Sequence, residues 1–127
     1  MKKVVLDTNA LMLPIQFKVD IFAELARLMD EPFEVVTCSS VIKELGTIAR
    51  GKGKDGIAAR FALRLLEKHN VKILESFNYK YADDWIVKFA KEEHAVVCTS
   101  DFDLRRRLQK QKLRVITLKE KNYLGFV

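Results

Sequence analysis

Acidic side chains follow or precede the apolar segments of this chain at positions where a parallel sheet would bring them together. Asp7 follows KVVL, Asp101 follows AVVCTS, and Glu44 lies one turn into the segment after EVVTC. Asp83 and Asp84 open the segment before AVVCT. Carboxylates that converge within about 4 to 6 Å repel one another by up to about 4 kcal/mol per pair at an effective dielectric near 20, unless protons or cations intervene. These residue types therefore predict a bound cation.

The donor set indicates the kind of cation. Oxygen ligands without His or Cys favour Mg²⁺ or Mn²⁺, as one or two ions, over Zn²⁺. Such ions can activate water and neutralise charge on a phosphodiester. Each acid alone also has a simpler interpretation, since an Asp after a strand commonly caps a helix. His69 and His94 lie at predicted helix ends without partner spacing, so we expect both to be exposed and neither to be a catalytic base.

The elements that position these acids alternate between strands and helices. Apolar runs rich in Val and Ile predict strands buried on both faces, over residues 3–6, 34–38, 71–74, 95–99 and 114–118. Helical spacing predicts helices over 19–30, 57–69, 82–93 and 101–112, and another that begins at a Ser39-Ser40 cap and fades at Gly51. This alternation predicts right-handed crossovers and a three-layer α/β/α sandwich with a parallel sheet of about five strands. Ligands of such sheets bind at the carboxyl ends of the strands.

Length and composition set broad limits. At 127 residues and 49% hydrophobic, the chain is expected to form one domain over residues 1–127. No apolar run approaches the roughly 20 residues of a membrane span, and MKKVVLDTN lacks a signal-peptide core, so we expect a soluble, cytoplasmic protein with no membrane partner. Cys38 and Cys98 lie inside apolar strand-like runs and not at metal-ligand spacing, which predicts buried free thiols. If their strands flank the first one, the two residues lie roughly 9.5 Å apart, which is beyond disulfide reach.

The chain is basic. Lys and Arg total 23 against 17 Asp and Glu, a net charge of +6 that would attract a polyanion. The glycine-rich segment 51–56 is predicted to be a mobile, basic loop. Charge alone does not separate nucleic-acid binding from an ordinary solvated lysine surface.

Four blocks of the sequence resemble the PIN-domain ribonuclease family in order and spacing. They are VVLDTNAL, SSVIKEL, YADDWIVKFA and VVCTSDFDLRRRL, and together they cover nearly the whole chain. The chain is most similar to small archaeal PIN proteins and to the PIN endonucleases of the small-subunit processome, and it also resembles VapC-type toxins. The resemblance implies a sheet of order 3-2-1-4-5 and a Mg²⁺- or Mn²⁺-dependent endoribonuclease acting on single-stranded RNA.

The resemblance also implies roles for individual acids. The family pattern places Ile three residues after the third acid, which is met by Asp83 with Ile86 and makes Asp84 the less favoured neighbour. The predicted catalytic and metal-binding acids, in motif order, are Asp7, Glu44, Asp83 and Asp101.

Further residues resemble supporting positions of the family. Asp103 is either a water-mediated metal ligand or a helix cap. Asn9 either orients Asp7 by a hydrogen bond or caps the short helix that follows it. Thr99 and Ser100 are expected to donate hydrogen bonds near the metal or a phosphate.

Basic and aromatic residues could hold the RNA. Phosphate contacts are predicted for Lys43, Arg50, Lys52, Lys54, Arg105 and Arg106, with solvated surface as the alternative. Phe102, Tyr79, Tyr81 and Trp85 are candidates for stacking an unpaired base, although core packing or a subunit contact is the favoured interpretation of Trp85.

Two other functions compete with the ribonuclease. One is a PIN domain that binds RNA or serves as a scaffold without catalysis. The other is an aspartyl-phosphate protein, either a dehalogenase-like phosphatase or a receiver domain, because Asp7 also ends a first strand. The phosphatase pattern expects another Asp two positions on, where this chain has Asn9, and a receiver expects a late-strand Lys. The resemblance implies two biological settings, a toxin neutralised by an antitoxin and a ribosomal RNA processing factor, and the similarity to the processome branch slightly favours processing. It implies RNA as a partner and leaves open a homodimer, an antitoxin or a ribosome-assembly partner.

Overall fold

A six-stranded sheet of order β3-β2-β1-β4-β5-β6 forms the centre of the computed structural model, which describes residues 1–127. The first five strands are parallel, which confirms the predicted order 3-2-1-4-5. Their bounds agree with the predicted runs to within two residues: β1 (Lys2–Leu6), β2 (Phe33–Cys38), β3 (Lys72–Leu74), β4 (Val96–Cys98) and β5 (Val115–Lys119).

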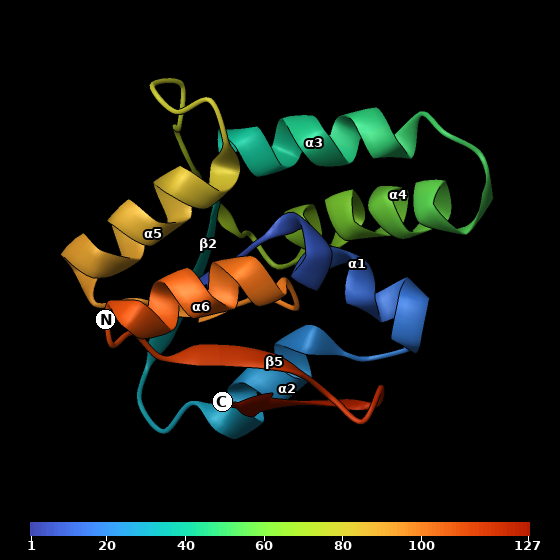
Figure 1. Ribbon diagram of the computed structural model, residues 1–127. Coiled ribbons are helices and arrows are strands. Elements are labelled where there is room, and N and C mark those ends of the chain that lie inside the picture. Colours follow the sequence, from blue (N-terminus) through green and yellow to red (C-terminus); the bar gives the residue numbers. More distant parts are fainter.

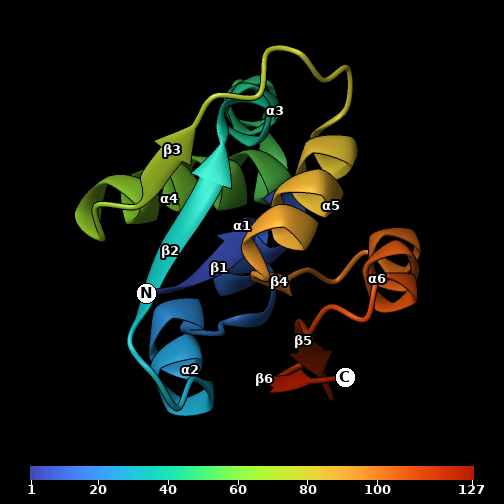
Figure 2. The same cartoon turned by 90° about the vertical axis from the view of Figure 1, so that its left-hand side faces the viewer.

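Helices cover both faces of the sheet (Figures 1 and 2). α5 (Ala82–Glu93) and α6 (Phe102–Lys110) lie side by side and pack on β1, β4 and β5, whereas α2 (Ile21–Leu28) packs on β6 from the opposite side. α1 (Thr8–Phe17), α3 (Ser39–Ala49) and α4 (Gly53–Lys68) pack against one another. None of the helices has the length and apolar content that a membrane span requires.

The register of the central strands places the site. β1 pairs with β4 so that Leu6 lies opposite Cys98, and both strands are fully buried at this end. Asp7 and Thr99 therefore leave adjacent strands at the same level of the sheet. Cys38 and Cys98 are buried and free, as predicted.

The first helix is longer than the sequence pattern indicates. α1 spans Thr8–Phe17 and contains Pro14, and four successive residues from Ala10 to Leu13 are buried in it. A helix buried on most of its circumference lacks the amphipathic spacing that reveals surface helices. Asp7, and not Asn9, caps this helix.

The glycine-rich segment was predicted to be a loop, and most of it is helical. α4 begins at Gly53, four residues before the predicted start. Gly56 is buried where α4 meets the preceding turn, and a Cβ atom there would lie 2.1 Å from the carbonyl oxygen of Gly51. This glycine therefore permits close packing and does not mark a flexible connection.

A sixth strand, β6 (Tyr123–Phe126), was not predicted. It runs antiparallel to β5 through a tight turn in which Glu120 and Lys121 have positive φ values of 51° and 61°. Asn-Gly or Asp-Gly usually occupies such a turn, and this sequence has neither there. The hairpin was therefore absent from the predicted elements.

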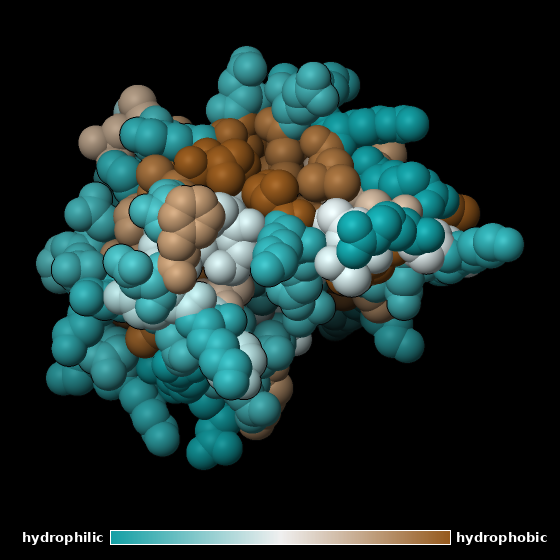
Figure 3. Space-filling view, turned by 90° about the horizontal axis from the view of Figure 1, so that it is seen from above, coloured by the Kyte–Doolittle hydropathy of each residue, from teal (hydrophilic) through white to brown (hydrophobic).

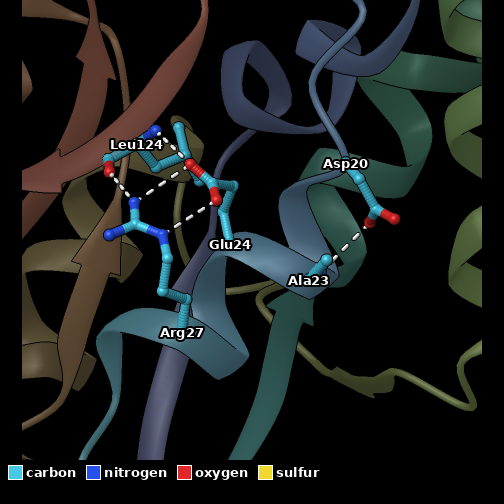
Figure 4. A network of polar contacts seen from close by, with 5 residues as sticks. All are labelled: Asp20, Ala23, Glu24, Arg27 and Leu124. Atoms are coloured by element: carbon cyan, nitrogen blue, oxygen red, sulfur yellow. Dashed lines mark hydrogen bonds and ion pairs between the residues drawn. The ribbon is translucent and has the colours of Figure 1, made fainter.

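Polar contacts attach β6 to α2 (Figure 4). The Leu124 amide donates to Glu24 Oε1 at 2.9 Å, and Arg27 Nη2 donates to the Leu124 carbonyl at 2.8 Å. Glu24 and Arg27 also form an ion pair at 3.0 Å, and these contacts lower the pKa of Glu24. The sheet edge at β6 is thereby fixed to the helix that covers it.

Candidate active site

Asp7 lies between β1 and α1 and is 5% exposed. Its Oδ1 accepts a hydrogen bond from the Ala10 amide at 2.8 Å, and its Oδ2 accepts one from the Thr99 hydroxyl. Burial, with smaller contributions from the nearby charges of Asp83 and Asp101, raises the pKa of Asp7 to about 7 despite these hydrogen bonds. The carboxylate thus lies in a negatively charged, poorly solvated environment.

Thr99 connects two of the predicted acids. Its hydroxyl donates to Asp7 and accepts a hydrogen bond from the Asp101 amide at 3.0 Å. Asp101 begins α6, where its Oδ1 accepts from the Leu104 amide at 2.8 Å. Both Asp7 and Asp101 are therefore helix caps, and the same geometry brings their two charges close enough to act on one another.

Asp83 belongs to the same group of charges. Its pKa is raised, chiefly by partial burial and then by Asp101, while the charge of Arg107 opposes the shift and Glu44 and Asp84 add smaller increases. Asp84 instead forms an ion pair with Arg107 at 2.8 Å. This difference favours Asp83 over Asp84 as a ligand, because Asp84 already has a cationic partner.

Glu44 reaches the site from α3. Its Oε2 accepts a hydrogen bond from the Thr8 hydroxyl at 2.8 Å, which joins α3 to the first residue of α1. Glu44 is exposed, so it retains freedom to move. Thr8 was not among the predicted site residues, although it directly follows Asp7 in the sequence.

Whether the site suits a cation depends on the chemistry of its four predicted acids. No lysine, arginine or histidine forms an ion pair with any of the four predicted acids. Burial, and to a smaller extent the repulsion between these acids, raises the pKa values of Asp7 and Asp83, and a hard cation would relieve both effects. No three Asp, Glu, His or Cys side chains lie close enough together to hold a metal ion. The residues that would hold a cation are Asp7 and Asp101 together with the half-buried Asp83 and the exposed Glu44.

The other predicted supporting residues lie at the edge of this group. Asn9 is exposed and forms no hydrogen bond with Asp7, whose partners are the Ala10 amide and Thr99. Ser100 and Asp103 are exposed, and Asp103 is not among the charges that act on Asp7. The structure therefore places Thr99 against Asp7 and Asp101, whereas Asn9, Ser100 and Asp103 form no hydrogen bond with the predicted acids.

The predicted basic residues fall into separate places. Lys43 lies beside Glu44 on α3, and the guanidinium groups of Arg105 and Arg106 lie 5.1 and 5.8 Å from the centre of the exposed Phe102 ring on α6. The remaining three, Arg50, Lys52 and Lys54, lie at the connection of α3 and α4, at the far end of α3 from the start of α5 (Figure 1).

A groove of about 810 Å³ opens beside the acids, between α3 and the segment that joins β3 to α5. Glu44 and Asp83 line it, together with Tyr79 and Tyr81. Trp85 is buried and stacks on Phe89 with ring centres 4.8 Å apart, so its role is core packing. His69 and His94 are exposed, as predicted.

The order of the sheet and the carboxylates at the ends of its central strands define the class of protein: an α/β domain with an acidic site. The chain belongs to the PIN-like domain family, whose model, described as "PIN like domain", matches residues 4–121.

Relatives of this chain are named as ribonucleases. Ribonuclease VapC4 of Methanocaldococcus jannaschii is 32% identical over 127 residues, with 97% of this chain and 95% of the relative covered. Ribonuclease VapC9 of Archaeoglobus fulgidus is 32% identical over 117 residues, with 91% of this chain and 82% of the relative covered.

Solved structures share the fold. The PIN domain endonuclease Utp24 superposes with a TM-score of 0.81 at 24% identity, covering 98% of this chain and 90% of the other. VapBC-1 from nontypeable Haemophilus influenzae superposes with a TM-score of 0.61 at 20% identity, covering 89% of this chain and 96% of the other.

Proposed function

We propose that this protein is an endoribonuclease that hydrolyses phosphodiester bonds of single-stranded RNA with Mg²⁺ or Mn²⁺. The observation that carries the proposal is the group of Asp7, Asp83 and Asp101, whose charges act on one another although they lie far apart in the sequence. The relatives named as ribonucleases, which this chain matches over nearly its full length, support the same reaction.

Each acid has a part in the proposed reaction. Asp7 and Asp101 are held by helix capping and by Thr99, so they form the rigid side of the site. Asp83 and Glu44 form the adjustable side. One or two cations held by these four residues would supply an activated water and neutralise charge on the phosphate. The protein's own contribution is to orient the acids and to hold Asp7 away from bulk water.

The toxin setting is favoured over ribosomal RNA processing. Both curated relatives carry VapC names, whereas the likeness to Utp24 at 24% identity concerns the fold. An antitoxin is therefore the partner that we propose. Expression in a bacterial host without a cognate antitoxin should slow growth, and the Asp101→Asn variant should not.

A cleavage assay tests the reaction. Wild-type protein and two variants are incubated with labelled single-stranded RNA in Mn²⁺, Mg²⁺ or EDTA. The wild type should cleave in either metal and not in EDTA, and Asp101→Asn should reduce the rate by roughly a hundredfold or more, as expected when a charged group at the reacting phosphate is removed. Asp84→Asn is the matched control, because this neighbouring acid pairs with Arg107 and should keep most of the activity. Undiminished cleavage in EDTA would refute metal dependence.

A non-catalytic RNA-binding domain is the second candidate. The observation in its favour is that no three potential ligands lie close enough together to hold a metal ion. The two functions differ in one result: RNA binding without cleavage by the wild type in Mn²⁺ would support the scaffold. Loss of cleavage in Asp7→Asn with retained RNA binding would support the enzyme.

A further inference from the structure

The groove beside the acids has the position of a substrate subsite. It lies between α3, the 75–81 segment and the start of α5, and Figure 2 shows this segment arching beside the first turn of α3. Glu44 and Asp83 line the groove and also belong to the acidic group. A nucleic acid with one phosphate at the acids would therefore place a neighbouring nucleotide in the groove. Its volume of about 810 Å³ lies within the roughly 300–1,000 Å³ typical of small-molecule pockets.

The lining combines rings with positive charges. Tyr81 is 60% exposed and Phe77 is 81% exposed, both on the segment that walls the groove. Lys80 Nζ lies 5.4 Å from the centre of the Tyr81 ring, and Lys43 enters from α3. Seen from above, this side of the molecule shows apolar surface bordered by hydrophilic side chains (Figure 3). Exposed rings beside cations match the combination of base and phosphate in a single-stranded nucleic acid.

Hydroxyl groups hold the wall of the groove in place. The Ser76 amide donates to Ser39 Oγ at 2.9 Å, and the Ser40 amide donates to Ser76 Oγ at 3.0 Å. The Ser40 and Ser76 hydroxyls also share a hydrogen bond of 2.6 Å. Ser76 is buried, so the segment is attached to the first turn of α3 before any ligand arrives. A site formed in advance loses less entropy on binding.

We propose that this groove binds the nucleotide next to the cleaved phosphate, with its base stacked on Tyr81 and its own phosphate facing Lys43 and Lys80. The inference rests on the proposed ribonuclease function and adds a specific subsite to it. A nucleotide is favoured over a protein segment because the rings are interleaved with lysines and the groove continues into an acidic group.

The test measures binding and does not require cleavage. Fluorescence anisotropy gives the affinity of a short, labelled, single-stranded oligoribonucleotide for the Asp101→Asn protein. The same oligonucleotide is then used with a single abasic position moved along it. Stacking is worth about 1–3 kcal/mol per base, so one abasic position should weaken binding by roughly 5- to 150-fold. Adding Tyr81→Ala should weaken binding of the intact oligonucleotide similarly and abolish the penalty at that position.

Two further variants make the result specific. Tyr81→Phe keeps the ring and should retain affinity. Tyr123→Ala removes an equally aromatic, exposed side chain from β6, at the opposite edge of the sheet from β3, and should leave affinity unchanged. A Tyr81→Ala protein with wild-type thermal stability and an unaltered abasic profile would overturn the subsite, as would an absence of RNA binding. If the subsite is overturned in this way, normal RNA cleavage by a protein that carries Tyr81→Ala alone would leave the ribonuclease proposal standing.

Discussion

The Asp7 carboxylate is buried without a cationic partner, so its protonation is linked to folding. Its pKa of about 7 in the folded chain lies above the ordinary value of 3.8. The folded protein therefore holds a proton that the unfolded chain releases between these two pH values. For an acid whose pKa is raised by folding, stability is lost as pH rises through this interval.

Asp7→Asn tests this linkage. Without metal, in EDTA, the free energy of unfolding of the wild type should fall between pH 4 and pH 8 by on the order of 4 kcal/mol relative to the variant. The reason is that each pH unit between the two pKa values is worth about 1.4 kcal/mol. Urea unfolding across this range measures it. Mn²⁺ at pH 8 should restore stability to the wild type and not to Asp7→Asn. Parallel pH profiles for the two proteins would contradict the linkage, and Asp103→Asn is the exposed control.

Thr99 is a positioning residue for the proposed reaction. Its hydroxyl lowers the pKa of Asp7 and accepts a hydrogen bond from the Asp101 amide. Thr99→Val keeps the shape and removes both hydrogen bonds, so half-maximal cleavage should require roughly 10- to 100-fold more Mn²⁺. The dependence of rate on Mn²⁺ concentration measures this effect. Thr99→Ser should restore the wild-type value. Equal metal requirements in all three proteins would leave Thr99 with a packing role only.

The acids themselves could be predicted from sequence because each follows or precedes a recognisable apolar run. Their partners were harder to predict. Thr8, whose hydroxyl donates to Glu44 36 residues away, has no local pattern that reveals this hydrogen bond. Asn9 belongs to the same motif as Asp7, but its position in α1 leaves its side chain exposed to solvent. The directions of the Thr8 and Asn9 side chains depend on where α1 begins, and the sequence pattern predicted this helix only in part.

At the scale of elements, periodicity identified the strands of the parallel sheet and most of the helices. The remaining elements are held by interactions that periodicity does not reveal. α1 is buried nearly all round, and the β5–β6 hairpin turns at Glu120 and Lys121 without the usual glycine. β6 owes its place to the polar contacts with α2 at Leu124.

Glu24→Ala should loosen β6 selectively. The variant removes the acceptor of the Leu124 amide and the ion pair that orients Arg27. Amide hydrogen exchange should therefore become faster at Leu124, with little change at Val97 in the centre of the sheet. Because folding lowers the pKa of Glu24, its contribution is present above pH 4.5 and is lost as pH falls through the lowered value. Glu67→Ala, an exposed change on α4, serves as control, and equal exchange in both variants would disprove the attachment.

At the scale of the molecule, a chain with an excess of positive charge carries a group of acidic residues at the ends of its central strands. The net charge is +6, yet the residues predicted to bind phosphate lie in different directions from the acids. Arg105 and Arg106 adjoin Asp101 on α6, whereas Arg50, Lys52 and Lys54 lie beyond the far end of α3. A short RNA centred on the acids reaches the first set more readily than the second.

Salt dependence distinguishes these two sets. For a single strand, the slope of log affinity against log salt should become shallower by about 0.7 for each phosphate that the protein no longer neutralises. With an RNA of a few nucleotides, Arg105→Gln with Arg106→Gln should make the slope shallower. The triple change of Arg50, Lys52 and Lys54 to Gln should do so only with longer RNA. Affinities measured from low to high salt provide the test. An effect of the triple change on the slope for the shortest RNA would contradict the conclusion that Arg50, Lys52 and Lys54 lie beyond its reach.

The hydroxyl link between Asp7 and Asp101 also has a consequence for protein synthesis. Thr99 and Asp7 are separated by 92 positions in the chain, and they meet only when β4 pairs with β1. A growing polypeptide on the ribosome therefore lacks the acidic pair until β4 has emerged and paired with β1. Any activity that needs both acids begins only after that step.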